Sequence, residues 1–198
     1  MAAPANADGP GAHKPAPPAA IAPVISAQDA IDAYNSGYAA IQRADHADAL
    51  AQSASSAAEK KQNSRAAQDA YKQSLQHFSA AVRLDASMHE AYTYLGYANR
   101  KLGRHSQALE AYDQALRIDS DYPYAIEYQG EAFLGLDRIE EARFNYLRLY
   151  ALNKGQARKL LQAMQSWVDS HASDATGFAA WVAERAETTR NDSPSSGW

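Results

Sequence analysis

The residues of this sequence that could do chemistry are scattered, and none of their spacings is typical of a catalytic centre. A nucleophile beside a base, two carboxylates in one pocket or a glycine-rich phosphate loop would each leave a recognisable pattern. No such pattern stands out, and the glycines of the central region fall at expected helix contacts and turns. We therefore expect a protein that is not an enzyme and that uses no cofactor.

One group of acidic residues invites a metal-site interpretation, and its surroundings argue against it. Asp119, Asp121 and Glu127 resemble part of a calcium-binding loop. Such a loop needs a further ligand and a glycine where this sequence has Pro123 and Tyr124. A calcium site is therefore not expected here.

A second candidate metal site, formed by Asp45, His46 and Asp48, fails for a geometric reason. Residues one or two positions apart on a helix do not face each other. A solvated polar stretch is the simpler interpretation, and it also suits Glu140-Glu141. Other histidines have no spacing typical of a metal site: His77, His89, His105 and His171. We expect no bound metal ion.

The bulk composition suits one soluble domain with tails. The chain has 198 residues, 46% of them apolar, and a net charge of −4, which disfavours a general nucleic-acid binder. No apolar run approaches the roughly 20 residues of a membrane-spanning helix, and no basic start leads into an apolar segment. We expect neither a membrane span nor a secretion signal in the sequence as given. Cysteine is absent, which excludes disulfides and thiol nucleophiles.

Both ends of the chain are expected to be disordered. Residues 1–25 hold six of the eight prolines together with nine alanines, a composition that prevents a regular helix. Such an arm resembles the mature N-termini of exported bacterial proteins. A periplasmic or otherwise exported protein is therefore one hypothesis, and a cytoplasmic protein is the alternative. Residues 191–198 are the second expected tail.

Residues 89–122 contain two helical runs that are separated at Leu102-Gly103-Arg104. Small and large apolar residues recur at helical spacing in both runs: Tyr92, Leu95 and Gly96, then Ala108, Tyr112 and Ala115. This pattern resembles the tetratricopeptide repeat, a pair of antiparallel helices. Two positions depart from the family pattern, with Asn99 in place of tyrosine and Ser120 in place of proline.

A shift by 34 residues, the period of this repeat class, superimposes the unit on the segment that follows it. Eight residues then coincide with residues of the same type in the following segment. They are Ala91, Tyr94, Gly96, Ala98, Leu102, Arg104, Ala108 and Tyr112, which fall on Ala125, Tyr128, Gly130, Ala132, Leu136, Arg138, Ala142 and Tyr146. The reverse shift places Phe78, Ala81, Arg83 and Asp85 on Tyr112, Ala115, Arg117 and Asp119. The sequence therefore predicts three units, residues 26–88, 89–122 and 123–154.

The first unit holds more residues than a normal repeat. Its first helix should begin near Ser26, where Asp29 completes a variant of the capping box. The apolar face of that helix would comprise Ile31, Tyr34, Tyr38 and Ile41. Residues 44–71 are alanine-rich and free of proline and glycine, which favours helix. We expect an extended antiparallel hairpin that turns near Ser53–Ser56, with a turn at Gln62-Asn63-Ser64 as the alternative.

A turn near Ser53–Ser56 would set two rows of small residues against each other. The rows are Ala47, Leu50, Ala51 and Ala54 on one arm and Ala58, Ala66, Ala67 and Ala70 on the other. Small residues bury little apolar area. The tip of the hairpin should therefore be weakly held.

The third unit should begin with Asp121 as a cap and Pro123 in the first turn, and Asn153-Lys154-Gly155 should end its second helix. Two apolar stripes follow, the second after Ser173-Asp174: Leu160, Leu161, Met164, Trp167 and Val168, then Phe178, Trp181 and Val182. A repeat array needs its last apolar face covered. Residues 155–190 are therefore expected to form capping helices.

These features predict an all-α fold, a right-handed α-α superhelix of about three tetratricopeptide-like helix pairs within residues 26–154. The first pair extends into a long antiparallel hairpin, and the capping helices close the C-terminal end. By resemblance to the family, the first helix of each pair lines a concave groove that binds an extended peptide or a partner helix. The groove residues implied in this way are Asn35, Gln42, Glu90, Thr93, Tyr94, Tyr97, Arg100, Lys101, Tyr124, Glu127, Tyr128, Glu131 and Leu134.

Tyrosine is the residue type that favours a binding function, because its ring gives a large contact area at small rotamer cost and keeps a polar hydroxyl. Four tyrosines suit a peptide ligand: Tyr94, Tyr97, Tyr124 and Tyr128. The alternative is that some of them, Tyr94 and Tyr128 above all, pack between neighbouring helices. One subclass of the family grips a C-terminal carboxylate with Lys, Arg and Asn side chains. The groove positions that would supply this clamp hold Thr93, Tyr94, Tyr97 and Tyr128, so we do not expect it.

Two functional hypotheses follow. In the first, the protein is a binding module that holds a protein or peptide partner in the tyrosine-lined groove. In the second, it is a structural or assembly protein that self-associates into a homo-oligomer. Self-association would use the extended hairpin or the C-terminal end around Trp167, Phe178 and Trp181.

Overall fold

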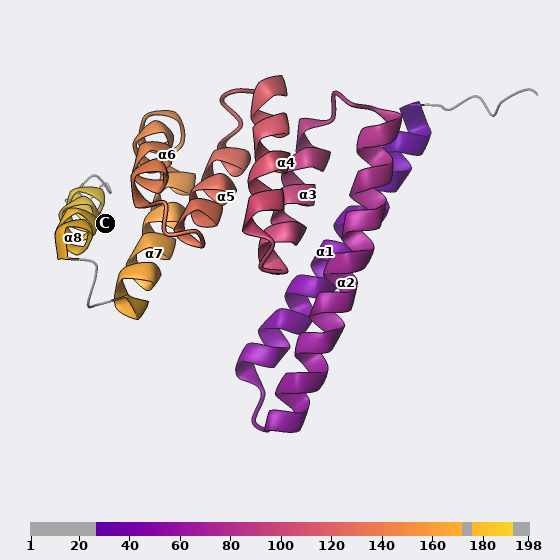
Figure 1. Ribbon diagram of the computed structural model, residues 1–198, viewed down its shortest axis with the longest axis horizontal. Coiled ribbons are helices and arrows are strands. Elements are labelled where there is room, and N and C mark those ends of the chain that lie inside the picture. The colour runs from indigo at the N-terminus through magenta and orange to yellow at the C-terminus, as the bar shows by residue number, and fades with distance from the viewer. Residues whose placement is uncertain (1–26, 172–175, 192–198) are drawn as a thin grey trace, which may run out of the picture.

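The computed structural model of the chain describes residues 27–171 and 176–191, which form eight helices and no strand (Figure 1). The helices are α1 (Ala27–Ser53), α2 (Ala57–Leu84), α3 (His89–Lys101), α4 (His105–Ile118), α5 (Pro123–Leu134), α6 (Ile139–Leu152), α7 (Lys154–Ser170) and α8 (Thr176–Asn191). The predicted all-α fold is confirmed. The N-terminal arm, the Ser26 cap, Ser173-Asp174 and residues 192–198 lie outside the described residues.

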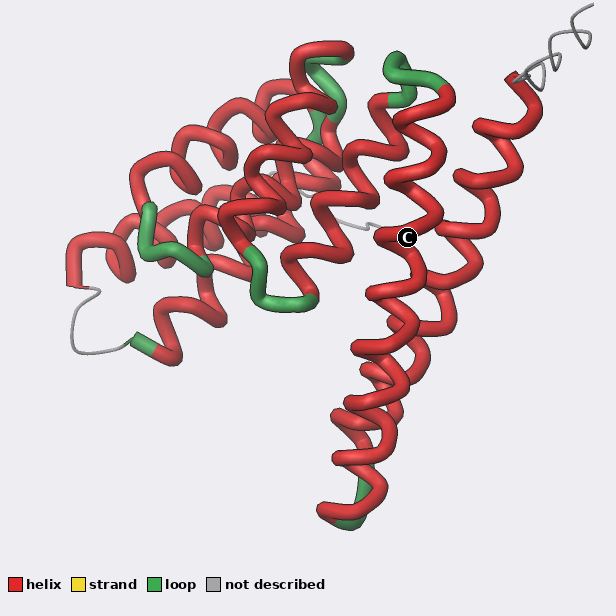
Figure 2. Tube along the Cα trace, turned by 45° about the vertical axis from the view of Figure 1, so that its right-hand side comes forward, coloured by secondary structure: helices red, strands yellow, loops and turns green. Residues whose placement is uncertain are grey.

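Consecutive helices pack as antiparallel pairs, α1 with α2, α3 with α4 and α5 with α6, and the pairs stand in one row (Figures 1 and 2). Each pair packs on the next through α2 against α3 and α4 against α5. The first helix of the middle pair, α3, also contacts both α1 and α5. The first helices of the three pairs therefore adjoin one another and together form one face of the array.

Glycine lets the two helices of the middle pair approach closely. A Cβ atom at Gly96 would clash with the ring of Tyr112, which is completely buried. Similar contacts occur at two other glycines: Gly37 against Phe78, and Gly130 against Leu160. The predicted break between α3 and α4 is also explained, because Gly103 has a φ of 74°, a left-handed backbone that glycine adopts without strain.

The hairpin of α1 and α2 turns at residues 54–56, within the predicted stretch, and its tip projects beyond the other helix pairs (Figure 1). The alternative turn at Gln62-Asn63-Ser64 is wrong, because these residues lie inside α2. Ser56 caps α2 by accepting a hydrogen bond from the Glu59 backbone N–H at 3.2 Å.

Only part of the predicted contact between the hairpin arms forms. Ala51 of α1 and Ala67 and Ala70 of α2 are buried. Leu50 was expected to face α2 but is 44% exposed, and Ala58 and Ala66 are exposed as well. Helices that approach through small residues bury a narrow stripe, so positions beside that stripe remain in solvent.

The third unit begins differently from the prediction. Pro123 does occupy the first turn of α5, but Tyr122 stands at the N-cap position and makes no side-chain cap. The predicted cap, Asp121, instead accepts a hydrogen bond from Arg148 of α6 at 3.2 Å. Its carboxylate therefore joins the linker to the second helix of the same pair.

The boundary after α6 is tighter than predicted. Asn153 alone separates α6 from α7, and its side chain accepts a hydrogen bond from the Gln156 backbone N–H at 3.1 Å. Lys154 and Gly155 therefore belong to α7 and do not end the array. An asparagine that ends one helix and caps the next makes a longer linker unnecessary.

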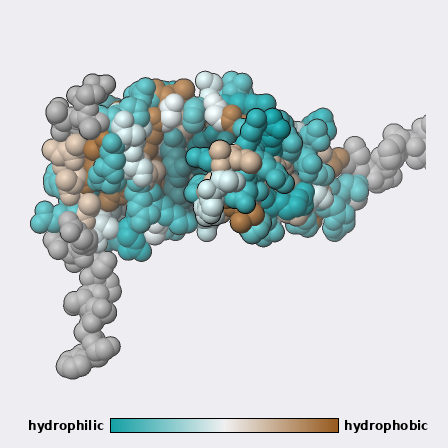
Figure 3. Space-filling view, turned by 90° about the horizontal axis from the view of Figure 1, so that it is seen from below, coloured by the Kyte–Doolittle hydropathy of each residue, from teal (hydrophilic) through white to brown (hydrophobic). Residues whose placement is uncertain are grey.

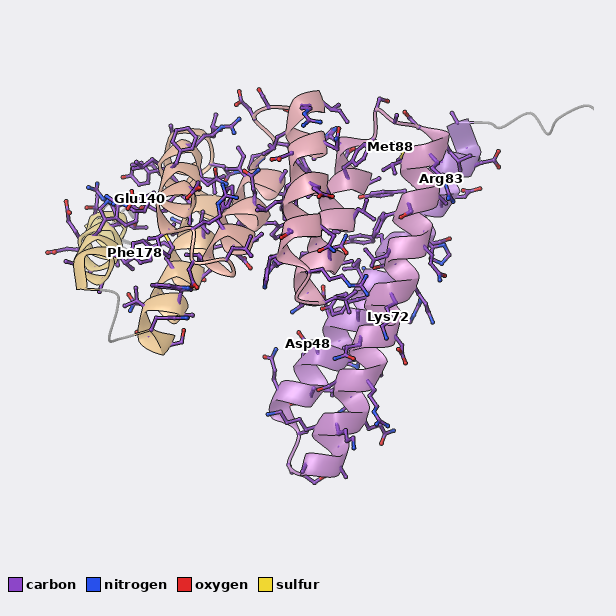
Figure 4. All side chains as sticks on the ribbon, viewed as in Figure 1. Asp48, Lys72, Arg83, Met88, Glu140 and Phe178 are labelled. Atoms are coloured by element: carbon purple, nitrogen blue, oxygen red, sulfur yellow. The ribbon has the colours of Figure 1, made fainter. Side chains whose placement is uncertain are left out.

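The two C-terminal helices cover the apolar end of the array. Leu160 and Met164 of α7 and Val182 of α8 are buried in one cluster with residues of α5 and α6. Phe178, labelled in Figure 4, packs against the same cluster from α8. Figure 3 shows that the surface seen from below is mostly hydrophilic, with apolar residues in small separate patches. Among the described helices, none combines the length and apolar character needed to cross a bilayer.

The close approach at Gly96 gives a direct test of the packing. We expect Gly96→Ala to lower the free energy of unfolding by about 1 to 3 kcal/mol, because the added methyl group meets the buried Tyr112 ring. The matched control is Gly177→Ala, whose new methyl group meets nothing within 4 Å and which should be neutral or stabilising by up to about 1 kcal/mol. Urea unfolding of both variants measures the difference, and equal effects would contradict the packing described here.

Candidate peptide-binding groove

A cavity of about 210 Å³ opens on the face formed by the first helices, between α1, α3 and the start of α5. We call it the tyrosine pocket. Its walls are Tyr38, Thr93, Tyr94, Tyr122, Tyr124 and Tyr128. Tyr38 and Tyr122 were not among the predicted groove residues. The helical spacing of the sequence predicts Tyr38 on the apolar packing face of its helix. Tyr122 lies in the linker before α5, so the helical spacing of residues did not identify it.

Aromatic rings run without interruption from the hairpin to the third unit. The ring centroids of Tyr38 and Tyr94 lie 5.3 Å apart, those of Tyr94 and Tyr97 lie 6.4 Å apart, and those of Tyr97 and Tyr128 lie 5.0 Å apart. Tyr94 also stacks on the buried Phe78 ring at 5.5 Å. Tyr94 therefore both packs between helices and lines the pocket, so the two interpretations of this residue are not exclusive.

Two aspartates of α1 attach the hairpin to the second unit. The Asp45 carboxylate accepts hydrogen bonds from the hydroxyls of Tyr71 at 2.6 Å and Tyr97 at 2.9 Å. Asp48, labelled in Figure 4, forms an ion pair with Lys101 at 2.5 Å. Burial and the Asp45 carboxylate raise the pKa of Tyr97 above its usual value, which keeps the hydroxyl protonated as a donor. Tyr97 and Lys101, predicted to contact a ligand, are thus engaged within the protein.

The second and third units are joined by a further ion pair, between Arg100 of α3 and Glu131 of α5. The Arg100 guanidinium lies over the ring of Tyr97, at 5.2 Å from its centroid, and over that of Tyr128 at 5.6 Å. These contacts hold α3 and α5 at a fixed separation. We call the polar contacts of Asp45, Asp48 and Glu131 with α3 the polar seam.

Glu127 is the one predicted groove residue whose carboxylate is both buried and incompletely bonded. Only 3% of the residue is exposed, and Oε2 has no hydrogen-bond partner in the described part of the chain. Burial and the neighbouring Glu131 carboxylate raise the pKa of Glu127 to about 7, against the opposing charges of Lys159 and Arg100. Near neutral pH this carboxyl is therefore divided between its protonated and charged forms.

The remaining predicted groove residues differ in their accessibility. Asn35 and Gln42 are exposed on α1, and Glu90 is partly exposed on α3. Thr93 is buried, and its hydroxyl donates to the His89 carbonyl at 2.8 Å. The prediction for Leu134 is wrong, because it lies in the apolar core that α5 shares with α6 and α7. Leu134 shares this buried cluster with Tyr146 of α6 and Leu160 of α7.

A larger cavity of about 470 Å³ lies elsewhere, against α4, α5 and α6. Phe144 of α6 lines it and is 67% exposed. None of the predicted groove residues contributes to this cavity. Within the described segments, no three His, Asp or Glu side chains come together where a metal ion could be held.

The tetratricopeptide repeat family model matches residues 89–122. These residues are a tetratricopeptide repeat. The match covers the α3–α4 pair, in which the predicted pattern was recognised, and confirms the resemblance. No curated protein matches the sequence at a significant level.

Two solved structures share the tetratricopeptide fold with this chain. The first tetratricopeptide domain of Spaghetti (RPAP3), bound to the HSP90 peptide SRMEEVD, has a TM-score of 0.54 and 17% identity, over 71% of this chain and 94% of that one. The first such domain of human RPAP3, solved by NMR, has a TM-score of 0.50 and 18% identity, over 73% of this chain and 99% of that one. These likenesses establish the fold and do not identify a ligand.

The raised pKa of Glu127 predicts a pH-dependent stability. The pKa of Glu127 is about 7 in the folded protein, and its usual value is 4.5. Between these two pH values the folded protein keeps a proton that the unfolded chain has released, so the contribution of Glu127 to stability falls as the pH rises from 4.5 to about 7. Glu127→Gln should remove the effect and leave the variant about 2 kcal/mol more stable than the wild type at pH 8. The gain should shrink towards pH 4.

Glu131→Gln is the control for this prediction. It removes the partner of the buried Arg100 and should destabilise the protein at pH 8. Urea unfolding of all three proteins from pH 4 to pH 8 provides the measurement. A constant difference between Glu127→Gln and the wild type across this range would contradict the assignment of a buried, raised carboxyl.

Proposed function

We propose that the protein is a non-enzymatic scaffold that holds an extended peptide, or an extended segment of a partner protein, in the groove formed by α1, α3 and α5. The main support for this proposal is the tyrosine pocket. Five tyrosines, which come from α1, α3, α5 and the linker before α5, line this one cavity. Tyr38 and Tyr124, at 39% and 43% exposure, offer their rings to a ligand.

The polar seam supports the proposal by fixing the groove before a ligand arrives. Asp45 and Asp48 hold α1 to α3, and Glu131 holds α5 to α3. A binding surface that is already ordered loses less conformational entropy on association. The cavity is also smaller than the roughly 300 to 1,000 Å³ of a drug-sized ligand site, which suits one peptide side chain.

The solved relatives support peptide binding as a use of this fold. The RPAP3 domain holds the acidic peptide SRMEEVD, but the identity of 17% does not transfer that ligand to this chain. The positions of Thr93, Tyr94 and Tyr128, where the carboxylate-binding subclass would place Lys, Arg or Asn, favour a different peptide chemistry. We therefore do not propose recognition of a chaperone tail.

Self-association, the second hypothesis, has less support from the contacts. Trp167 packs edge-on against Phe178 at 5.7 Å, and Phe178 stacks on Trp181 at 6.0 Å. These rings thus use much of their surface inside the chain, between α7 and α8. Light scattering over a range of concentrations separates the hypotheses, because a strict monomer that binds peptides excludes an assembly role.

Selection from a random peptide library displayed on phage, with the full chain as target, tests the proposed function. Peptides selected in this way should lose at least about tenfold in affinity for the double variant Tyr38→Ala, Tyr124→Ala. The loss is expected because both rings line the pocket and both are accessible. Circular dichroism and urea unfolding would verify that the variant remains folded.

The matched control for this experiment is Phe144→Ala. Phe144 is more exposed than either tyrosine and lines the other cavity, so its removal should leave peptide affinity unchanged. If the selected peptides lost affinity for Phe144→Ala and kept it for the tyrosine variant, the groove assignment would be wrong.

A further inference from the structure

The tyrosine pocket has the electrostatic character of a cation site. Its lining contains five tyrosines and one threonine, and no basic side chain. The face of an aromatic ring carries the negative end of its quadrupole and attracts ammonium and guanidinium groups. We propose that the pocket binds a cationic side chain of the ligand, a lysine ammonium or an arginine guanidinium, an inference that rests on the proposed function.

Two acidic residues share helix faces with lining residues, because Glu90 lies three residues before Thr93 on α3 and Glu127 lies three residues after Tyr124 on α5. Burial and then the Glu90 charge raise the pKa of Tyr122 to about 12. Burial and then the Glu127 charge raise the pKa of Tyr128 above its usual value. Both tyrosines line the pocket, so each carboxylate acts on a lining ring. A cation in the pocket would gain attraction from rings and carboxylates together.

No basic side chain of the protein lines the pocket. His89 packs on the ring of Tyr122, with the centroids 4.6 Å apart, and lies 3.3 Å from the Glu90 carboxylate. Arg100 is paired with Glu131, and Lys101 is paired with Asp48. Lys159 of α7 is exposed and lies 6.0 Å from the ring centroid of Tyr124. Lys159 is not a lining residue, so a cation that contacts Tyr124 can approach from outside the cavity without filling it.

An acidic or neutral polar ligand group finds few partners here. The Thr93 hydroxyl donates to the His89 carbonyl, so it is not available to an anion. The tyrosine hydroxyls could each donate one hydrogen bond, but the Glu90 carboxylate, and Glu127 in its charged form, would repel a second negative charge. The charge pattern is thus opposite to that needed for an acidic peptide such as SRMEEVD, which the RPAP3 domain binds.

A double-mutant cycle on the full chain tests this inference. Peptides from the library selection should share a lysine or arginine at one position, and replacing a lysine there with norleucine, its uncharged analogue, should weaken binding by about tenfold or more. The same replacement should matter much less for Tyr124→Leu, which keeps the bulk but removes the aromatic face. Isothermal titration calorimetry measures the four affinities.

The variant Lys159→Met provides an independent test of the charge of the bound group. Removal of a positive charge beside the pocket should strengthen binding of the lysine peptide about twofold or more and leave the norleucine peptide unaffected. Weaker binding of the lysine peptide would overturn the inference, because the loss of a positive charge beside a cation site cannot weaken the binding of a cation there.

The outcomes separate this inference from the function on which it rests. Selected peptides that depend on Tyr38 and Tyr124 but show no cationic preference, or a cycle without coupling, would overturn the cation site and leave the peptide groove standing. Selected peptides that bind regardless of Tyr38 and Tyr124 would overturn the groove, and the cation site with it.

Discussion

The close approach of paired helices is the constraint on which the rest of the structure depends. A buried Tyr112 ring occupies the space that a side chain at Gly96 would need, and a repeat pair can bury its apolar face only if the helices come this near. Stacked pairs then bring α1, α3 and α5 together. Because that face is built from the first helices alone, their outward residues meet across unit boundaries and create the groove.

The polar seam divides the groove residues into two kinds. In the first kind, the polar group is engaged in a contact between units. This holds for the Tyr97 hydroxyl, the Arg100 guanidinium and the Lys101 ammonium. The rings of the tyrosine pocket remain accessible, with Tyr38 and Tyr124 the most exposed of them. Opposite charges thus join the units, and the accessible aromatic surface is the part of the molecule that we propose meets a ligand. On our proposal, the acidic residues beside that surface favour a cationic ligand group.

The periodicity of the sequence predicted the features that the units share. It did not predict the features in which one unit differs from another. The 34-residue shift located the α3–α4 and α5–α6 pairs. The alanine-rich stretch without proline or glycine predicted the hairpin, and a turn that gives arms of nearly equal length predicted where it bends. The polar seam could not be predicted, because Lys101 and Asp48 are far apart in the chain and meet only after an inserted hairpin has set their register. Tyr122 was missed because it stands in a linker, and Leu134 was misplaced because α7 buries it.

Chemical-shift mapping by NMR tests the central claim most directly, namely that ligands meet the rings shared by α1, α3 and α5. The full chain would carry isotope-labelled tyrosine and phenylalanine and be titrated with the tightest peptide from the library selection. The account predicts that the largest shift changes fall on Tyr38, Tyr94 and Tyr124, with Phe144 unchanged. Changes confined to Phe144 and its neighbours on α6, with silent pocket tyrosines, would contradict it.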